Sequence, residues 1–187
     1  MTAPFVIDGY AIVTVEGMIA DAHAAVPDSL KNEADQAYFS SALDAAALVV
    51  HGRHSHEGHP NSPRRRRFWL TRKVADLQPV AGAALEWLWN PAGVSLADAA
   101  RRIGLERGTI AALGGTEVYD LFLPVYRAFH LSRAGNAHMP VGAPVFSAVR
   151  DGLTPEQILA RSGLKQGATR VLDAENEVTT TTWERRL

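Results

Sequence analysis

An acidic residue followed by two aromatic residues forms the first segment whose residue types could carry chemistry. Asp35 precedes Tyr38 by three positions and Phe39 by four, so a helix would place these side chains on one face. A carboxylate beside aromatic rings can be partly desolvated, which suits it to proton transfer or to pairing with a protonated heterocycle. Most helical acids simply face water, so this interpretation depends on what packs against the helix.

A short polar turn follows an apolar run at residues 45–50. The turn reads Gly52, Arg53, His54 and Ser55. An Arg guanidinium offers a fork of donors and a Ser hydroxyl adds another, which together suit a phosphate monoester. The alternative interpretation is a solvated loop.

A pair of glycines, Gly114 and Gly115, lies between an apolar run at residues 109–113 and a helix expected to start at Thr116. Glycine lets the backbone approach a diphosphate closely, and the amides at a helix start attract negative charge. Such a pair is also ordinary turn chemistry. Taken alone it permits both interpretations.

Alternating strand and helix patterns position these segments. Apolar runs predict strands at residues 10–15, 45–50, 68–70, 84–89 and 109–113. Helical spacing predicts one helix over residues 27–43, capped by Asp28 or Ser29, and another over 96–103, capped by Ser95. This alternation predicts an α/β domain with a central, mostly parallel mixed sheet flanked by helices.

The C-terminal part of the chain has a different pattern. A short helix is expected from Thr154, and residues 170–172 and 178–183 predict an antiparallel hairpin around Asn176. No segment is long enough to serve as a linker between domains. We therefore expect a single domain over residues 1–187.

Composition narrows the class of protein. The 187 residues are 47% apolar and 21% charged, with a formal net charge of -1, which is typical of a globular domain and does not favour nucleic acid or an anionic membrane. The absence of cysteine excludes disulfide scaffolds and thiolate chemistry. No basic leader or membrane-length apolar run is found, so we expect a soluble cytoplasmic protein without nucleic acid or membrane partners.

In this order and with these intervals, the three segments resemble the dihydrofolate reductase family over residues 10–140. Further matching segments are Pro63 with Arg65, residues 95–124, residues 130–132 and residues 135–140. The resemblance implies a dihydrofolate-reductase-like three-layer fold, in which residues 141–187 complete the sheet. It also implies hydride transfer from NADPH to a C=N bond of dihydrofolate or a related pterin.

The resemblance further implies roles for particular residues. Asp35, oriented by Ser132, would be the catalytic group that binds the amidine-like edge of the acceptor and favours its protonated state. NADPH would contact Ile12, Ile19, Ala20, Gly52, Arg53, His54, Ser55, Thr71, Arg72, Gly114, Gly115, Thr116, Glu117, Val118 and Tyr119. The acceptor would contact Ile12, Asp35, Phe39, Arg65, Leu113 and Ser132, with Arg65 on an anionic tail.

The chain departs from the family's pattern before the acidic helix. Residues 24–30 lack the family's Pro-Trp pair. Residues 16–21 and 29–31 are closer to the reductase domain of riboflavin biosynthesis, which shares this fold. Arg65 favours dihydrofolate, whereas these departures favour another pterin or a ribosylaminopyrimidine. Both kinds of acceptor stay open, and so does the choice between a monomer and a homodimer.

Two other classes of protein compete with a reductase. Residues 95–113 and 153–172 each place a Gly between short segments, as in the helix-turn-helix of a DNA-binding regulator. The first run leads directly into the Gly-Gly turn, and the near-neutral charge opposes the second. A metal site is suggested by His51, His54, His56 and His59. Their segment lacks helical ligand spacing, so we expect no metal.

Overall fold

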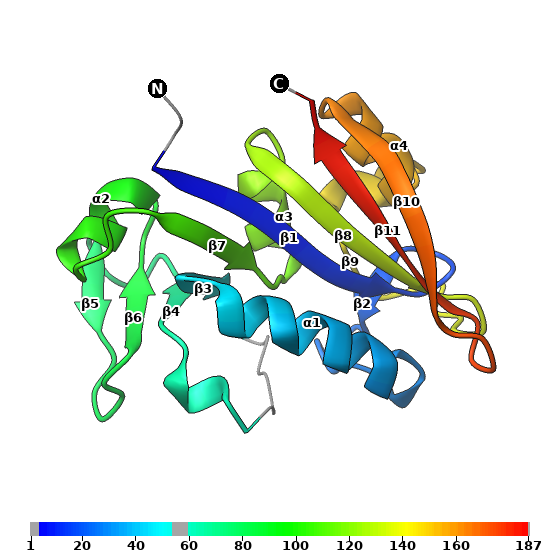
Figure 1. The fold of residues 1–187 in the computed structure, drawn as a ribbon, viewed down its shortest axis with the longest axis horizontal. Coiled ribbons are helices and arrows are strands. Elements are labelled where there is room, and N and C mark those ends of the chain that lie inside the picture. The colour runs from blue at the N-terminus through cyan, green and yellow to red at the C-terminus, as the bar shows by residue number, and fades with distance from the viewer. Residues whose placement is uncertain (1–3, 54–59, 187) are drawn as a thin grey trace.

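The computed structural model describes residues 4–53 and 60–186. Within them, nine strands form one sheet in the order β10-β11-β8-β1-β7-β3-β4-β6-β5, and β2 pairs with β9 separately (Figure 1). The strands are β1 (Phe5–Val13), β2 (Met18–Ala20), β3 (Leu48–His51), β4 (Arg67–Leu70), β5 (Leu77–Pro79), β6 (Glu86–Trp89), β7 (Gly108–Ala112), β8 (Tyr126–Ala134), β9 (Ala143–Pro144), β10 (Leu164–Asp173) and β11 (Val178–Arg185). The α-helices are α1 (Glu33–Ala45), α2 (Leu96–Arg102), α3 (Thr116–Phe122) and α4 (Pro155–Arg161).

The centre of the sheet is parallel and its edges are antiparallel. Neighbours from β8 through β1, β7, β3 and β4 to β6 run parallel, whereas β11, β10 and β5 add antiparallel strands. All four residues of β3 are buried, as expected for a strand covered on both faces. The predicted mostly parallel mixed sheet and the C-terminal hairpin are therefore confirmed.

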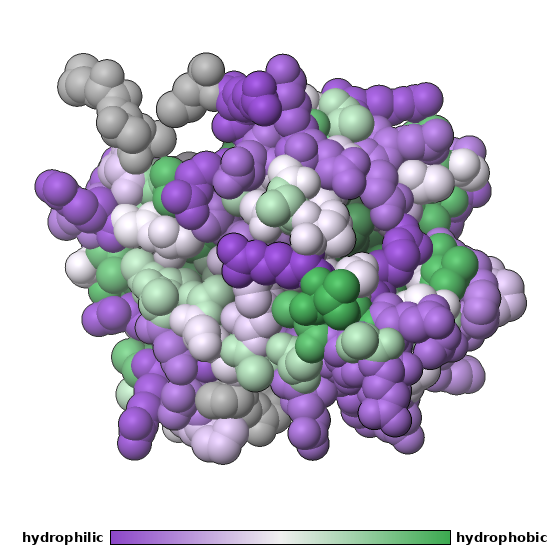
Figure 2. Space-filling model, turned by 45° about the vertical axis from the view of Figure 1, so that its right-hand side comes forward, coloured by the Kyte–Doolittle hydropathy of each residue, from purple (hydrophilic) through white to green (hydrophobic). Residues whose placement is uncertain are grey.

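Helices cover both faces of the sheet, which makes three layers (Figure 1). On one face, Leu43 of α1 packs with Val49 and Ala111 of the sheet. On the other face, Ile110 lies in a larger core that includes residues of α2, α3 and α4, such as Val118. The alternation of Ile110 and Ala111 between these two cores follows the period-2 geometry of a strand. The surface in Figure 2 is mainly hydrophilic, with hydrophobic side chains gathered in small groups.

Helix α1 begins later than predicted. Residues 28–30 form a separate 3-10 turn, η1 (Asp28–Leu30), and the N-cap of α1 is Asn32 rather than Asp28 or Ser29. Burial of Leu30 against Ala134 anchors the turn, and Lys31 leaves helical geometry. The prediction was wrong because this packing of Leu30 depends on a strand about 100 residues away in sequence.

The boundary between α1 and β3 was also misplaced. Residues 45–50 were predicted as a strand, but α1 continues to Ala45 and β3 begins at Leu48. Alanine is the best helix former, and a continuous apolar run does not reveal where a helix ends and a buried strand begins.

Neither candidate helix-turn-helix is present. Helix α2 leads into strand β7, and α4 leads into β10, which pairs with β11. A helix-turn-helix needs a second helix to enter the DNA groove, and each segment has a strand in its place. The alternative of a DNA-binding regulator therefore loses the motif on which it rested. Among the described residues, no helix is long and apolar enough to cross a membrane.

Candidate active site

Asp35 is a buried carboxyl in the first turn of α1. Its exposed fraction is 8%, and its backbone N–H donates to the Asn32 Oδ1 atom at 3.0 Å. Burial raises the pKa of the Asp35 carboxyl, while a hydrogen bond with the Ser132 side chain acts in the opposite direction. Ser132 lies on β8 and is itself 3% exposed. The structure thus brings together the two residues for which a catalytic role was predicted.

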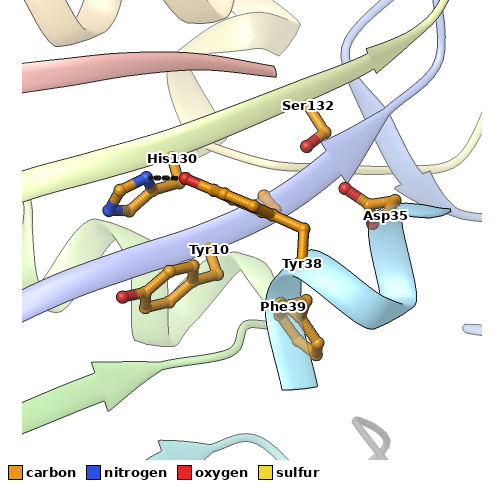
Figure 3. A pocket seen from close by; sticks show the side chains of 7 residues that line it. Tyr10, Asp35, Tyr38, Phe39, His130 and Ser132 are labelled. Carbon is orange, nitrogen blue, oxygen red and sulfur yellow. Dashed lines mark hydrogen bonds between the residues drawn. The ribbon is translucent and has the colours of Figure 1, made fainter. Parts of the chain in front are cut away.

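A small cavity lies between α1 and strands β1 and β8. It has a volume of about 10 Å³ and is lined by Tyr10, Ala11, Asp35, Tyr38, Phe39, His130 and Ser132. Figure 3 shows the Asp35 carboxyl and the Ser132 hydroxyl facing each other at one end of this group. The volume is close to that of a single water probe. The predicted helical face of Asp35, Tyr38 and Phe39 therefore turns toward the sheet and not toward solvent.

Three rings form the other end of the cavity lining. The Tyr10 and His130 rings stack with their centroids 4.6 Å apart, and the Tyr38 hydroxyl is hydrogen-bonded to the Nδ1 atom of His130 at 2.8 Å (Figure 3). Burial lowers the pKa of His130. This favours the neutral imidazole, for which Tyr38 supplies a partner.

The two segments predicted to bind phosphate meet at the ends of β3 and β7. The Gly52 N–H donates to the Gly114 carbonyl at 2.6 Å, and the Gly114–Gly115 peptide bond is cis. A Cβ on Gly114 would lie 2.7 Å from the Tyr119 ring, but a Cβ on Gly115 would have nothing within 4 Å. The backbone at Gly115 is therefore open to close approach by a ligand.

Other residues with predicted cofactor contacts gather around this turn. Arg72 donates to the Glu117 carboxylate at 3.1 Å, and both side chains are exposed. Arg53 is exposed after Gly52, whereas His54 and Ser55 lie outside the described residues. The Thr116 hydroxyl donates to the Pro144 carbonyl. Arg53 and Arg72 are thus both exposed, Arg53 just after β3 and Arg72 just after the neighbouring strand β4.

The buried residues of α3 face inward. Val118 is 1% exposed and Tyr119 is 3% exposed. The Tyr119 hydroxyl donates to the Tyr10 carbonyl on β1. Burial, followed by the negative charge of Asp35, raises the pKa of Tyr119. Tyr119 thus stays protonated and joins α3 to the strand that lines the cavity.

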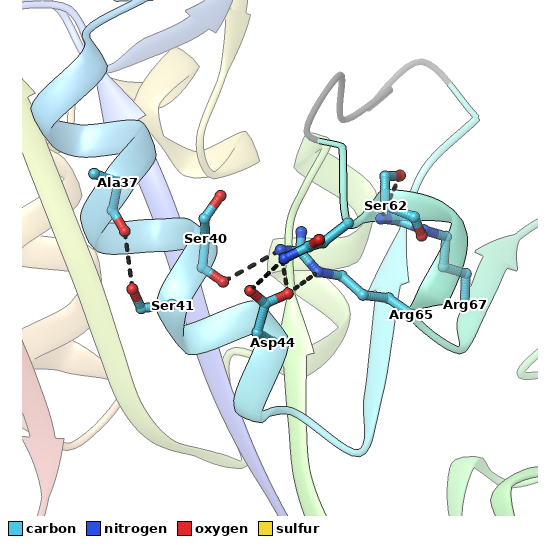
Figure 4. A network of polar contacts seen from close by, with 8 residues as sticks. Ala37, Ser40, Ser41, Asp44, Ser62, Arg65 and Arg67 are labelled. Atoms are coloured by element: carbon cyan, nitrogen blue, oxygen red, sulfur yellow. Dashed lines mark hydrogen bonds and ion pairs between the residues drawn. The ribbon is translucent and has the colours of Figure 1, made fainter.

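Arg65 is engaged by a carboxylate of the chain itself. Its Nε and Nη2 atoms donate to the Asp44 Oδ1 atom at 2.9 and 2.6 Å, and Nη2 also donates to the Ser40 carbonyl at 3.3 Å (Figure 4). The Arg65 side chain is 4% exposed. With Arg64 and Arg66 it lines a polar hollow of about 380 Å³.

Comparisons with known proteins find solved structures with a similar fold but no matching sequence family. No family model and no curated protein matches the chain. A solved structure described as a riboflavin biosynthesis protein from Shewanella sp. PV-4 matches 97% of this chain and 99% of its own, with a TM-score of 0.66 and 18% identity. Dihydrofolate reductase from Enterococcus faecalis, complexed with NADP(H) and the compound RAB-propyl, matches 97% and 96%, with a TM-score of 0.63 and 16% identity.

The chain has a dihydrofolate-reductase-like fold. The predicted resemblance is thereby confirmed at the level of the fold, and the nearly complete coverage extends it beyond residues 10–140.

In this dihydrofolate-reductase-like fold, the predicted acceptor residues other than Arg65 come from α1, β1, β8 and the end of β7. Phe39 and Leu113 pack in one apolar cluster with Tyr10, and Ile12 pairs with Ser132 across β1 and β8. Ile19 and Ala20 belong to β2, which pairs with β9. Thr71 follows β4 and its N–H donates to the Trp89 carbonyl.

Polar residues near Ser132 that the sequence did not single out include Thr180 and His130, of which His130 lines the cavity. Thr180 on β11 is 1% exposed, is registered opposite Ser132, and has a hydroxyl without a hydrogen-bond partner among the described residues. His130 lies two positions before Ser132 on β8, so both point to one face of the strand. The two-residue spacing from Ser132 is the signal by which His130 could have been found in the sequence. No pattern in the sequence placed Thr180 beside Ser132, because β11 and β8 are paired only in the folded sheet.

Proposed function

We propose that this protein is an NADPH-dependent reductase that transfers hydride to a C=N bond of dihydrofolate or a related pterin. The observation that carries the proposal is Asp35, a buried carboxyl with a raised pKa beside the Ser132 hydroxyl. It lies in a fold shared with a dihydrofolate reductase that was solved with NADP(H). A buried carboxyl with a hydroxyl partner is suited to hydrogen-bond a heterocycle and to stabilise its protonated form.

The glycine turns support a dinucleotide cofactor. The open backbone face of Gly115 admits close approach of a diphosphate, and the hydrogen bond between Gly52 and Gly114 keeps the two turns adjacent. Arg53, together with Arg72 in its exposed ion pair with Glu117, would supply the positive charge that the 2'-phosphate of NADPH needs. Ile12, Ile19 and Ala20 would line the nicotinamide end. The residues present therefore fit the cofactor.

In the proposed reaction, the chain's own residues hold the acceptor in place and stabilise its protonated form. When bound, NADPH would supply a hydride for the carbon of the C=N bond, and the ring nitrogen would gain one proton that originates from water. Asp35 binds the amidine-like edge of the acceptor and stabilises the protonated ring, directly or through water. Ser132 orients Asp35, while Phe39 and Leu113 pack on the rings.

A second acceptor is favoured by the pairing of Arg65 with Asp44. A guanidinium already neutralised by an internal carboxylate attracts the carboxylate tail of a folate less strongly. This supports a ribosylaminopyrimidine or a tail-less pterin in place of dihydrofolate. These acceptors would all take hydride from NADPH, but the pterins would take it on a ring C=N bond and the ribosylaminopyrimidine on its sugar-derived carbon.

One experiment tests both candidates. The purified protein is incubated with NADPH and, separately, with dihydrofolate, a tail-less dihydropterin or a ribosylaminopyrimidine, and cofactor oxidation is followed at the NADPH absorbance. Turnover with at least one acceptor, together with thermal stabilisation by NADPH greater than by NADH, is the expected result. Stabilisation by NADPH without oxidation by any acceptor would instead identify a nucleotide-binding protein.

A further inference from the structure

The C-terminal hairpin reaches the helix that carries Asp35 through one carboxylate. Asp173, at the end of β10, accepts a hydrogen bond from the Asn32 Nδ2 atom at 2.7 Å. It also accepts from the Asn176 N–H at 3.0 Å and from the Asn176 Nδ2 atom at 2.7 Å. Asn32 and Asp173 are 141 positions apart in the sequence. The contact therefore exists only because β10 and β11 fold back beside the start of α1.

Asn32 uses the two ends of its amide for different partners. Its Oδ1 atom accepts from the backbone N–H of Asp35 at 3.0 Å, which makes Asn32 the N-cap of α1. Its Nδ2 atom donates to Asp173. An ionised carboxylate can only accept hydrogen bonds, so Asp173 selects the amide orientation in which Oδ1 points to the helix. The reversed amide would set two oxygens against each other and leave the Asp35 N–H without its cap.

Apolar packing holds the same two segments in place. Leu30, just before the cap, is buried with Ala134 and Val178, and Leu172 packs against that cluster. Leu172 and Val178 flank the hairpin turn that contains Asp173. The hydrogen bonds from Asn176, with that from Asn32, hold the pKa of Asp173 at about 2, so its carboxylate is ionised at neutral pH.

We propose that Asp173 is a positioning residue for Asp35: it orients Asn32, and Asn32 fixes the first turn of α1 so that the Asp35 carboxyl stays buried beside Ser132. The assignment rests on the proposed function in taking Asp35 as the catalytic group. It gives the C-terminal hairpin, whose predicted role was only to complete the sheet, a part in the site.

The test measures the pKa of the Asp35 carboxyl by NMR titration in the protein without cofactor or acceptor. Asp173→Ala removes the acceptor, and Asn32→Ser keeps a capping hydroxyl but loses the amide that reaches Asp173. The double variant combines them. Glu175→Ala is the matched control, because it removes one carboxylate from the same turn and Glu175 is exposed.

Loosening of the first helical turn hydrates Asp35, so each single variant is expected to lower its pKa toward the ordinary value by about half a unit. The double variant should shift the pKa no further than Asn32→Ser alone, because both changes break one chain of contacts. Glu175→Ala should leave the pKa unchanged. An Asp35 pKa equal to that of the wild-type protein in both single variants would overturn the proposal.

The two proposals fail separately. If no acceptor is reduced, the reductase function fails, yet the titration still decides the role of Asp173. If an acceptor is reduced, Asp173→Ala should lower kcat by about tenfold while leaving the KM for NADPH unchanged, since misplacement of a reacting group affects turnover first. If circular dichroism shows that Asp173→Ala does not fold, the pKa of Asp35 in Asn32→Ser decides the question, because the Ser hydroxyl still caps α1.

Discussion

Burial of the Asp35 carboxyl sets function against stability at the scale of a single residue. The folded protein raises the pKa of this group, so the ionised carboxylate is less favourable in the folded protein than in the unfolded chain. As the pH falls through the folded pKa, the carboxyl takes up a proton and this cost begins to shrink, and it disappears below the unfolded pKa. Such opposition between stability and activity is common where a site must hold a strained or desolvated group.

Asp35→Asn is therefore expected to increase the free energy of unfolding at pH 7 while reducing turnover. The stability gain should vanish below the ordinary carboxyl pKa of 3.8, where the wild-type group is protonated in both states. Loss of the acid should lower kcat by about a hundredfold or more, with NADPH affinity retained. Urea unfolding at several pH values and steady-state kinetics measure the two effects. Near-wild-type turnover across the pH range would remove Asp35 from the mechanism.

Arg65 and Asp44 give a second prediction at this scale. If the acceptor carries a carboxylate tail, Asp44→Ala should remove the internal carboxylate that competes for Arg65 and lower the KM for dihydrofolate by about tenfold, the worth of one charge-assisted hydrogen bond. A tail-less dihydropterin should keep its KM in this variant and in Arg65→Ala. An unchanged KM for dihydrofolate in Asp44→Ala would show that Arg65 does not contact the tail.

At the scale of elements, β1 carries the site because it lies between β8 and β7 in the centre of the sheet. Close approach of aromatic rings requires glycine within it. A Cβ on Gly9 would lie 2.3 Å from the Phe129 ring and 2.9 Å from the Tyr126 ring. Gly9→Ala is expected to lower the free energy of unfolding by about 3 kcal/mol through overpacking, as measured by denaturant unfolding. A loss well under 1 kcal/mol would mean that the rings move aside readily.

The turn between β7 and α3 provides the contrasting substitution. Gly115 has φ -56, and a Cβ there would meet nothing within 4 Å. Gly115→Ala should change stability by no more than about 0.5 kcal/mol. The added methyl group would occupy the space into which a diphosphate approaches, so NADPH affinity should fall about tenfold, or about 1.4 kcal/mol. Isothermal titration checks this, and unchanged affinity would place the cofactor elsewhere.

At the scale of the whole molecule, Glu16 joins two loops that are far apart in sequence. Its carboxylate accepts from the Met139 N–H at 2.7 Å and pairs with the His138 Nδ1 atom at 3.1 Å. The hydrogen bond from the Met139 backbone N–H, together with the one from the His138 side chain, lowers the pKa of Glu16 to about 2. A depressed carboxyl pKa contributes stability above the unfolded pKa, and this contribution is lost as the pH falls through the folded pKa.

Glu16→Gln is accordingly expected to be less stable than the wild-type protein at pH 6, with the difference shrinking between pH 4.5 and about 2. Thermal unfolding across that range measures it. The exposed Glu106→Gln change is the control and should leave the wild-type pH profile intact. A stability difference that does not vary with pH would show that the carboxylate of Glu16 is not responsible.

Local patterns in the chain were sufficient for the order of most elements and for the segments that carry chemistry. Ser95 caps α2 as predicted, with its hydroxyl accepting from the Asp98 N–H at 3.1 Å, and the Gly-Gly turn links β7 to α3. The short strands β2, β5 and β9 were missed, because two or three residues are too few to show a period. Asp35 and Ser132 were paired by resemblance, and the fold places them together.

By itself, then, the sequence determined the α/β class, the parallel core and the helical face that carries Asp35. Only the tertiary structure decided that Asp44 engages Arg65, that His130 meets Tyr38, and that Asp173 reaches Asn32. Periodicity and capping act over a few neighbouring residues and so can be read along the chain. Partners separated by 21, 92 and 141 positions are set by the order in which strands pair and by the side chains packed between them, which no local pattern encodes.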